Sequence, residues 1–166
     1  MKFISLHLCF VCISVPVLMF AQGKFAGGYG SLIGKNYKDE KELTILYGFT
    51  SRGGTLLSDT DDPVSLSASW YSKGNLIVAL FEQKDGDKGS FILDVLEIRN
   101  VLANQTLSIG DCKDGENVST GFVALVNETK EERFKAVRAW FFNRDKIRLE
   151  SWNPSRVTCI GMVGDD

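Results

Sequence analysis

The segment VSLSASWYSKGNLIVALF, residues 64–81, contains two strand patterns joined by one turn. In residues 64–71, apolar side chains at even positions alternate with serines and Tyr71, and this period of two predicts a half-buried strand. Residues 72–75 combine serine, glycine and asparagine, which are typical of a turn. Residues 76–81 are apolar throughout, which indicates a strand that is covered on both faces or lines the interior of a barrel.

Further strand patterns precede and follow this segment. Their ranges are 25–33, 43–49, 91–96, 106–109, 120–126, 147–152 and 157–162. Residues 51–63 are predicted to be irregular, and residues 84–89 form a predicted turn in which glycine adopts positive φ. Strands at intervals of about eight to twelve residues predict an all-β fold, either an antiparallel β-sandwich or a small barrel of about 8–10 strands.

The segment 129–142 has features of both a helix and a strand. Thr129 followed by Glu132 matches a capping box, and Phe134, Val137 and Phe141 recur at helical spacing. The aromatic-rich residues 139–142 lead into a polar turn, which favours a strand. We predict a strand over the later half, with one short helix near 130–138 as the alternative.

The N-terminus has the organisation of a secretory signal. Lys2 is followed by an apolar stretch over residues 3–20 and by the small residue Ala21 as a cleavage point. The stretch is also long enough for a membrane anchor, but its N-terminal position favours cleavage. We therefore predict a signal peptide at 1–21, a single β-rich domain at 22–166, no stable membrane span after cleavage, and a secreted or periplasmic location.

The charge of the chain bears on its partners, and its cysteines bear on the compartment in which it works. The chain has 19 basic and 21 acidic residues without a cluster of one sign, so no nucleic-acid partner is expected. Cys112 and Cys159 are the two cysteines outside the leader, and in an oxidising compartment they predict one disulfide. Two separate free thiols are the alternative.

Histidine chemistry is absent from the predicted mature chain, because the only histidine, His7, lies in the leader. This excludes Ser-His-Asp and Cys-His nucleophilic systems and histidine-ligated metals. Glycoside hydrolysis by two facing carboxylates stays possible, but the sequence singles out no pair; Asp94 and Glu97, for example, have an odd spacing that directs them to opposite faces of a strand. No catalytic residue is assigned and no cofactor is expected.

Aromatic side chains are the better candidates for ligand binding. A concave site for a sugar or a small apolar ligand is usually lined by such residues. The candidates are Tyr71, Trp70, Trp140 and Trp152. Core packing is the competing interpretation for most of them, and Tyr71 is expected to be the most exposed because it lies on the serine face of its strand.

Two further sets of polar residues are candidates for calcium binding and for glycosylation. An acidic loop before Pro63 is either a calcium site or an exposed turn; it contains Asp59, Asp61 and Asp62. Three Asn-x-Ser/Thr sequons are glycan acceptors only if the chain passes through a eukaryotic secretory pathway. They begin at Asn104, Asn117 and Asn127.

Two parts of the chain resemble small uncharacterised secreted proteins of Gram-negative bacteria. They are the junction Phe20-Ala21-Gln22 and the ending that contains Ala139-Trp140, Lys146 and Val157-Thr158-Cys159. The resemblance covers the leader and roughly the last third of the chain. It implies a β-rich exported domain without catalytic residues, and in a bacterium the sequons would be polar turns.

These observations favour an exported, non-enzymatic β-domain that binds a small ligand, a glycan or a protein partner. One alternative is a carboxylate-dependent saccharide hydrolase, which needs two carboxylates across a cleft. Another is a lipocalin-like carrier of a hydrophobic ligand, although residues 27–29 lack the tryptophan expected at the start of such a chain.

Overall fold

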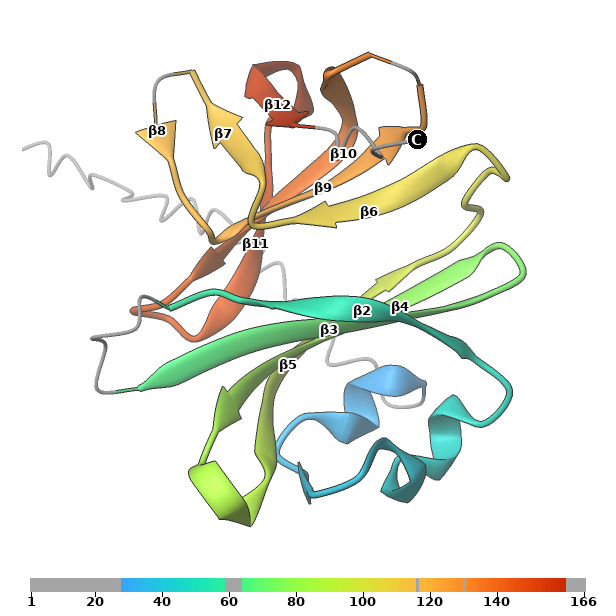
Figure 1. Cartoon of the computed structure of the whole chain (residues 1–166), viewed down its shortest axis with the longest axis vertical. Coiled ribbons are helices and arrows are strands. Elements are labelled where there is room, and N and C mark those ends of the chain that lie inside the picture. Colours follow the sequence, from blue (N-terminus) through green and yellow to red (C-terminus); the bar gives the residue numbers. More distant parts are fainter. Residues whose placement is uncertain (1–27, 59–63, 116, 130, 161–166) are drawn as a thin grey trace, which may run out of the picture.

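The computed structural model describes residues 28–58, 64–115, 117–129 and 131–160. Within these residues the chain forms twelve β-strands and five short 3₁₀ helices, and no helix reaches seven residues. The strands make two curled antiparallel sheets that pack as a sandwich or half-barrel (Figure 1). The predicted all-β fold is confirmed. The strands outnumber the predicted 8–10 because several have only two to four residues.

The first sheet has the strand order β1-β5-β4-β3-β2. Its members are β1 (Asn36–Tyr37), β2 (Thr50–Leu56), β3 (Ser65–Lys73), β4 (Leu76–Lys84) and β5 (Ser90–Ile98). The predicted hairpin is β3–β4, paired without interruption from Ser65 opposite Lys84 to Lys73 opposite Leu76. β2 corrects the prediction of an irregular segment at 51–63. Residues 59–63 of that segment lie outside the described residues.

Strand β4 is buried on both faces, as its apolar run predicts. Ile77, Ala79 and Phe81 point into the core between the two sheets. Val78 and Leu80 point to the opposite face and are fully buried there as well. A strand of this kind needs a cover on each side of its sheet.

The outer cover is the segment 29–49, which we name the N-terminal cap and which lies beneath the first sheet in Figure 1. It contains the 3₁₀ helices η1 (Tyr29–Leu32), η2 (Glu40–Glu42) and η3 (Thr44–Leu46). Leu32, Leu43 and Leu46 pack against the outer face of the sheet.

The strands predicted at 25–33 and 43–49 are therefore wrong for the described residues; 25–27 lie outside them. One physical reason is local capping, since the Asp39 carboxylate accepts a hydrogen bond from the Lys41 amide (2.9 Å) and the Glu42 side chain accepts one from the Asp39 amide (3.3 Å). The other is the spacing of the buried residues Leu43 and Leu46, which is three and not two.

The second sheet has the order β6-β9-β10-β12-β7-β8, and β11 pairs with β10. Its strands are β6 (Gln105–Ile109), β7 (Cys112–Asp114), β8 (Asn117–Val118), β9 (Phe122–Asn127), β10 (Arg133–Asn143), β11 (Arg148–Trp152) and β12 (Val157–Ile160). β10 overturns the alternative of a helix near 130–138, because the chain is extended from Arg133 onwards. It pairs with three strands, and those pairings outweigh the local helical spacing. Residue 130 is outside the described residues.

The predicted disulfide joins Cys112 and Cys159. The two cysteines lie opposite each other in β7 and β12. These strands cover the outer face of β9, where Phe122, Ala124 and Val126 are buried against the cysteines. The disulfide thus fixes the outer cover of the second sheet, as the N-terminal cap covers the first.

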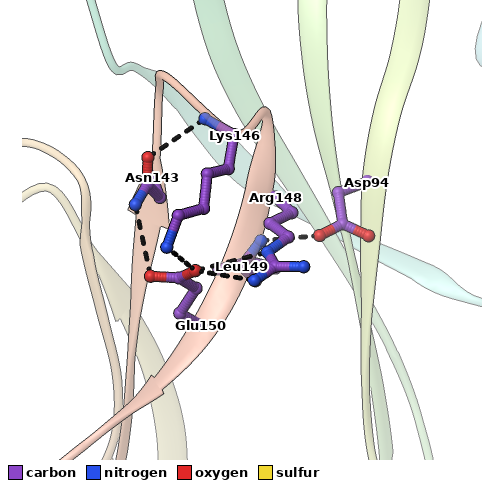
Figure 2. Close-up of polar contacts among 6 residues, drawn as sticks. All are labelled: Asp94, Asn143, Lys146, Arg148, Leu149 and Glu150. Carbon is purple, nitrogen blue, oxygen red and sulfur yellow. Dashed lines mark hydrogen bonds and ion pairs between the residues drawn. The ribbon is translucent and has the colours of Figure 1, made fainter. Parts of the chain in front are cut away.

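The β10–β11 hairpin connects the two sheets on the side of β5 (Figure 2). The Leu149 amide donates to the Asp94 carboxylate on β5 over 2.7 Å. Next to it, the Glu150 carboxylate accepts hydrogen bonds from Lys146 (2.8 Å), Asn143 (3.2 Å) and Arg148 (3.1 Å). These partners, Lys146 foremost, lower the pKa of Glu150 to about 2.

Loss of the disulfide is expected to destabilise the fold. The bond closes a loop of 47 residues, for which the loop-entropy model gives about 4 kcal/mol. Cys159→Ser should lower the melting temperature by about 10 °C in calorimetry under oxidising conditions. Reductant should lower the wild-type value to that of the variant; an unchanged value in the variant would contradict the assignment.

The hairpin is expected to weaken in acid. Because the pKa of Glu150 is lowered from 4.5 to about 2, its charged form stabilises the folded state above pH 4.5, and this contribution is lost as the pH falls towards 2. Glu150→Gln should therefore melt below wild type at pH 6 and together with wild type at pH 2. A constant difference between the two melting temperatures over this range would refute the ion-pair explanation.

Candidate binding site

A cleft of about 590 Å³ is lined by residues of β2, an edge strand of the first sheet, and of β6, an edge strand of the second. Its lining comes from both sheets. Arg52, Gly53, Gly54, Thr55 and Trp70 belong to the first, and Leu107, Ile109, Val126, Phe134 and Ile160 to the second. A volume of this size is typical of sites for small or extended ligands.

The cleft has two sides because the side chains of β6 alternate. Leu107 and Ile109 point between the sheets, where Trp70 also packs. Thr106 and Ser108 therefore point to the outer face of the second sheet. We name these the inner side, next to Trp70 and the β2 glycines, and the outer side, next to Val126, Phe134 and Ile160.

The edge of β6 presents backbone groups to the cleft. Within the described residues β6 pairs with β9 alone. Gly110 donates its amide to Phe122 O (3.1 Å), and the Glu128 amide donates to Asn104 O (2.7 Å). Since antiparallel ladders alternate, the even positions of β6 bond to β9, and the N–H and C=O groups of Leu107 and Ile109 point away from it.

One end of the cleft is closed by contacts between the sheets. The Thr120 hydroxyl donates to the Leu57 carbonyl (2.6 Å), to which the Arg144 guanidinium also donates. Gly110 approaches Thr55 so closely that a Cβ at this glycine would lie 3.6 Å from the Thr55 side chain. β2 and β6 thus meet beyond residue 109, and residues 106–109 of β6 line the cleft.

Three charged side chains line the cleft. The Arg52 guanidinium donates to the Ser72 hydroxyl over 2.7 Å and is therefore held towards β3. Asp111 follows β6, and Glu128 lies beside Asn104, just before β6 begins. Both carboxylates are exposed, and in the described part of the chain neither carboxylate has a hydrogen-bond or ion-pair partner. Near each end of β6 there is thus a negative charge without a partner among the described residues.

The structure separates the four aromatic residues that the sequence singles out. Trp70 lines the cleft. Trp140 packs against the core between the sheets, and Trp152 donates its Nε1–H to Asp114 (2.9 Å) within an outer aromatic cluster. Tyr71 is 4% exposed, so its predicted exposure is wrong: the N-terminal cap covers the serine face of β3.

The other predicted sites lie elsewhere. Asp59, Asp61 and Asp62 are outside the described residues, and in the part of the chain that is described no group of three or more His, Cys, Asp or Glu side chains could hold a metal. Of the sequons, Asn104 and Asn127 are exposed beside the start of β6, and Asn117 belongs to β8.

A buried carboxylate, which the sequence did not indicate, lies under the N-terminal cap. Glu82 on β4 is 1% exposed. Its Oε1 accepts hydrogen bonds from the Tyr37 hydroxyl and the Ser69 hydroxyl (3.3 Å), and its Oε2 accepts one from Ser67 (3.5 Å). The Lys84 ammonium lies 3.9 Å from Oε2. Burial raises the pKa of Glu82.

Local backbone geometry brings Tyr37 to this carboxylate. β1 pairs with the first residues of β5, Tyr37 opposite Ser90. Gly89 precedes them with a φ of +103°, and a Cβ there would overlap the Tyr37 carbonyl. Only glycine allows this approach. Glu82 does not line the cleft, and its cluster joins the cap to the sheet.

No protein-family model matches the chain, and neither the curated proteins nor the solved structures contain a match to it. The assignment of a function therefore depends on the geometry of this structure.

Neutralising Glu82 is expected to stabilise the protein increasingly as the pH rises. Because burial raises the pKa of Glu82, the contribution of the protonated form is complete below pH 4.5 and is lost as the pH rises through the folded-state pKa. Glu82→Gln keeps an acceptor for Tyr37 without the charge. Its melting temperature should equal that of wild type near pH 4 and exceed it at pH 8.

The matched control is Glu131→Gln, which removes an exposed carboxylate and should show no such trend. If wild type were the more stable protein at pH 8, the attraction between Glu82 and Lys84 would outweigh the cost of burial, and the prediction would be wrong.

Proposed function

We propose that this chain is an exported, non-enzymatic binding protein whose site is the cleft along β6. The observation that carries the proposal is the combination of apolar lining with a strand edge whose main-chain groups have no partner among the described residues. Trp70 supplies a flat apolar surface on the inner side, and Phe134 and Ile160 supply one on the outer side. Sites that combine apolar walls with a few convergent polar groups are typical of ligand recognition.

Binding is favoured over hydrolysis by the nature of the carboxylates in the cleft. A glycosidase needs one carboxyl whose environment keeps it protonated, usually an apolar pocket. Asp111 and Glu128 are both exposed. The buried carboxylate Glu82 lies on the other face of the first sheet, where the N-terminal cap encloses it.

A carrier that encloses its ligand between the sheets has less support. Phe81 and Phe142 stack across the middle of the sandwich, with ring centroids 5.3 Å apart. Fully buried Ile98, Val123 and Leu125 surround them. A ligand in this protein would lie at the open edge and not in an enclosed interior.

Export is supported by two independent features. Residues 1–21 have the sequence pattern of a signal peptide, and Cys112 pairs with Cys159 in a disulfide, a bond that persists in oxidising compartments. Among the described residues, no helix has the length and apolar character needed to cross a membrane.

The cleft can be tested with N-phenyl-1-naphthylamine, a neutral aromatic probe that fluoresces in apolar surroundings. The folded protein should bind it saturably. Thr106→Trp, which places an indole on the outer side of the cleft, should change the affinity or the emission of the bound probe. Thr50→Trp is the control, because this exposed residue lies on β2 outside the cleft; both variants should keep the wild-type circular dichroism spectrum.

Absence of saturable binding to wild type would refute the proposed site. The same signal in Thr106→Trp as in Thr50→Trp would also contradict it, because the probe would then lie elsewhere on the protein.

A further inference from the structure

We propose that the natural occupant of the cleft is an extended peptide segment of a partner protein, which adds as a strand to β6 and carries basic residues at both ends. This inference rests on the proposed function and specifies its ligand class. Strand addition uses the main chain for affinity and pockets on either side of the edge for specificity.

The first argument is the contrast between β2 and β6, the two edge strands that line the cleft. Edges are normally protected by charges, prolines or bulges. β2 has two of these protections, a charge at Arg52 and a bulge between Ser51 and Gly53, and it also contains two glycines. β6 has the sequence Gln-Thr-Leu-Ser-Ile, with no charge and no proline, and regular pairing to β9. Both strands line the cleft, and β6 is the one whose edge lacks these protections.

The second argument is that the cleft extends to both sides of the β6 edge. Successive side chains of a strand point to opposite faces. A peptide paired with Leu107 and Ile109 would therefore place alternate side chains on the inner side, towards Trp70, and on the outer side, towards Phe134 and Ile160. A compact small molecule would occupy one side and leave the other empty.

The third argument is the placement of charge. Glu128 lies beside the start of β6 and Asp111 beyond its end. Since Arg52 is held by Ser72, it does not neutralise either carboxylate. A strand of about five residues, the length of β6, would thus have one carboxylate near each of its ends. Lysine or arginine at both ends of the peptide matches this pattern.

The same charges disfavour a second copy of the chain as the occupant. In an antiparallel pair of β6 edges related by a two-fold axis, the start of one strand lies beside the end of the other. Glu128 of one copy would then approach Asp111 of the second copy. Like charges in such positions oppose pairing, so the edge selects a basic partner over itself.

The test uses the probe peptide acetyl-Lys-Val-Ile-Thr-Val-Lys-amide and the full mature chain labelled with ¹⁵N. Titration should shift the amide signals of Leu107 and Ile109 and slow their hydrogen exchange. Two analogues, N-methylated at alternate internal positions, separate strand pairing from simple apolar contact. The analogue methylated on the positions that face β6 should bind about tenfold more weakly, and the other should bind like the parent peptide.

Charge is tested in the same titration. Replacing both terminal lysines of the peptide by glutamates should weaken binding about fivefold or more. The double variant Asp111→Asn, Glu128→Gln should bind the two peptides with similar affinity. Equal binding of both N-methylated analogues, or no preference of wild type for the basic peptide, would overturn the inference.

Two outcomes separate this inference from the proposed function. If the naphthylamine probe binds in the cleft and the peptide does not, the peptide inference fails and the binding site stands; if neither binds, both fail. If the peptide binds to a chain truncated after Ile160 but not to the full chain, the occupant of the cleft is the chain's own C-terminus. If the protein is a dimer that the peptide does not dissociate, the occupant is a second copy. Either result would overturn the proposal.

Discussion

Burial of β4 on both faces is the constraint on which the rest of the structure depends. Ile77, Ala79 and Phe81 face the second sheet, whereas Val78 and Leu80 face the N-terminal cap. Burial of each isoleucine, valine, leucine or phenylalanine side chain contributes about 1.5–3 kcal/mol, and neither set is buried without its cover. The chain therefore folds as three layers around one strand, with the disulfide-linked strands β7 and β12 as a further cover on the second sheet.

Because β4 is buried on both faces, a polar side chain in this strand needs hydrogen-bond partners within the protein. Glu82 continues the outward-facing series of β4, and removing a carboxylate from water without partners would cost several kcal/mol. The hydroxyls of Tyr37, Ser67 and Ser69 supply those partners. The serines of β3 are thus not a solvent-facing row, as their alternation indicated, but the polar lining of a buried carboxylate.

Sequence patterns predicted the parts of the fold that depend on local regularity. The alternation in β3, the apolar run of β4 and the cysteine pair led to the correct fold class, hairpin and disulfide. The cap was missed because short 3₁₀ turns bury leucines three apart within an apolar-rich segment that also fits a strand. The missed cap also explains the wrong prediction for Tyr71. The cap covers the serine face of β3, so Tyr71 on that face is buried and not exposed. The cleft was beyond sequence reasoning, since it depends on which strands become edges; Trp70 was the one lining residue that composition identified.

The Glu82 cluster and the cleft lie on opposite sides of the first sheet, so the binding that we propose for the cleft would be separate from the contacts that stabilise the N-terminal cap. The Glu82 cluster couples the N-terminal cap to β3 and β4, whereas the cleft is lined by β6 and by Trp70 on the other face of β3. An edge whose main chain does the binding can accept changes at Thr106 and Ser108, which point outward from β6, without loss of its hydrogen-bonding groups. The backbone would then supply the affinity, and the two sides of the cleft with Asp111 and Glu128 would supply the selectivity. Both would be independent of the buried core.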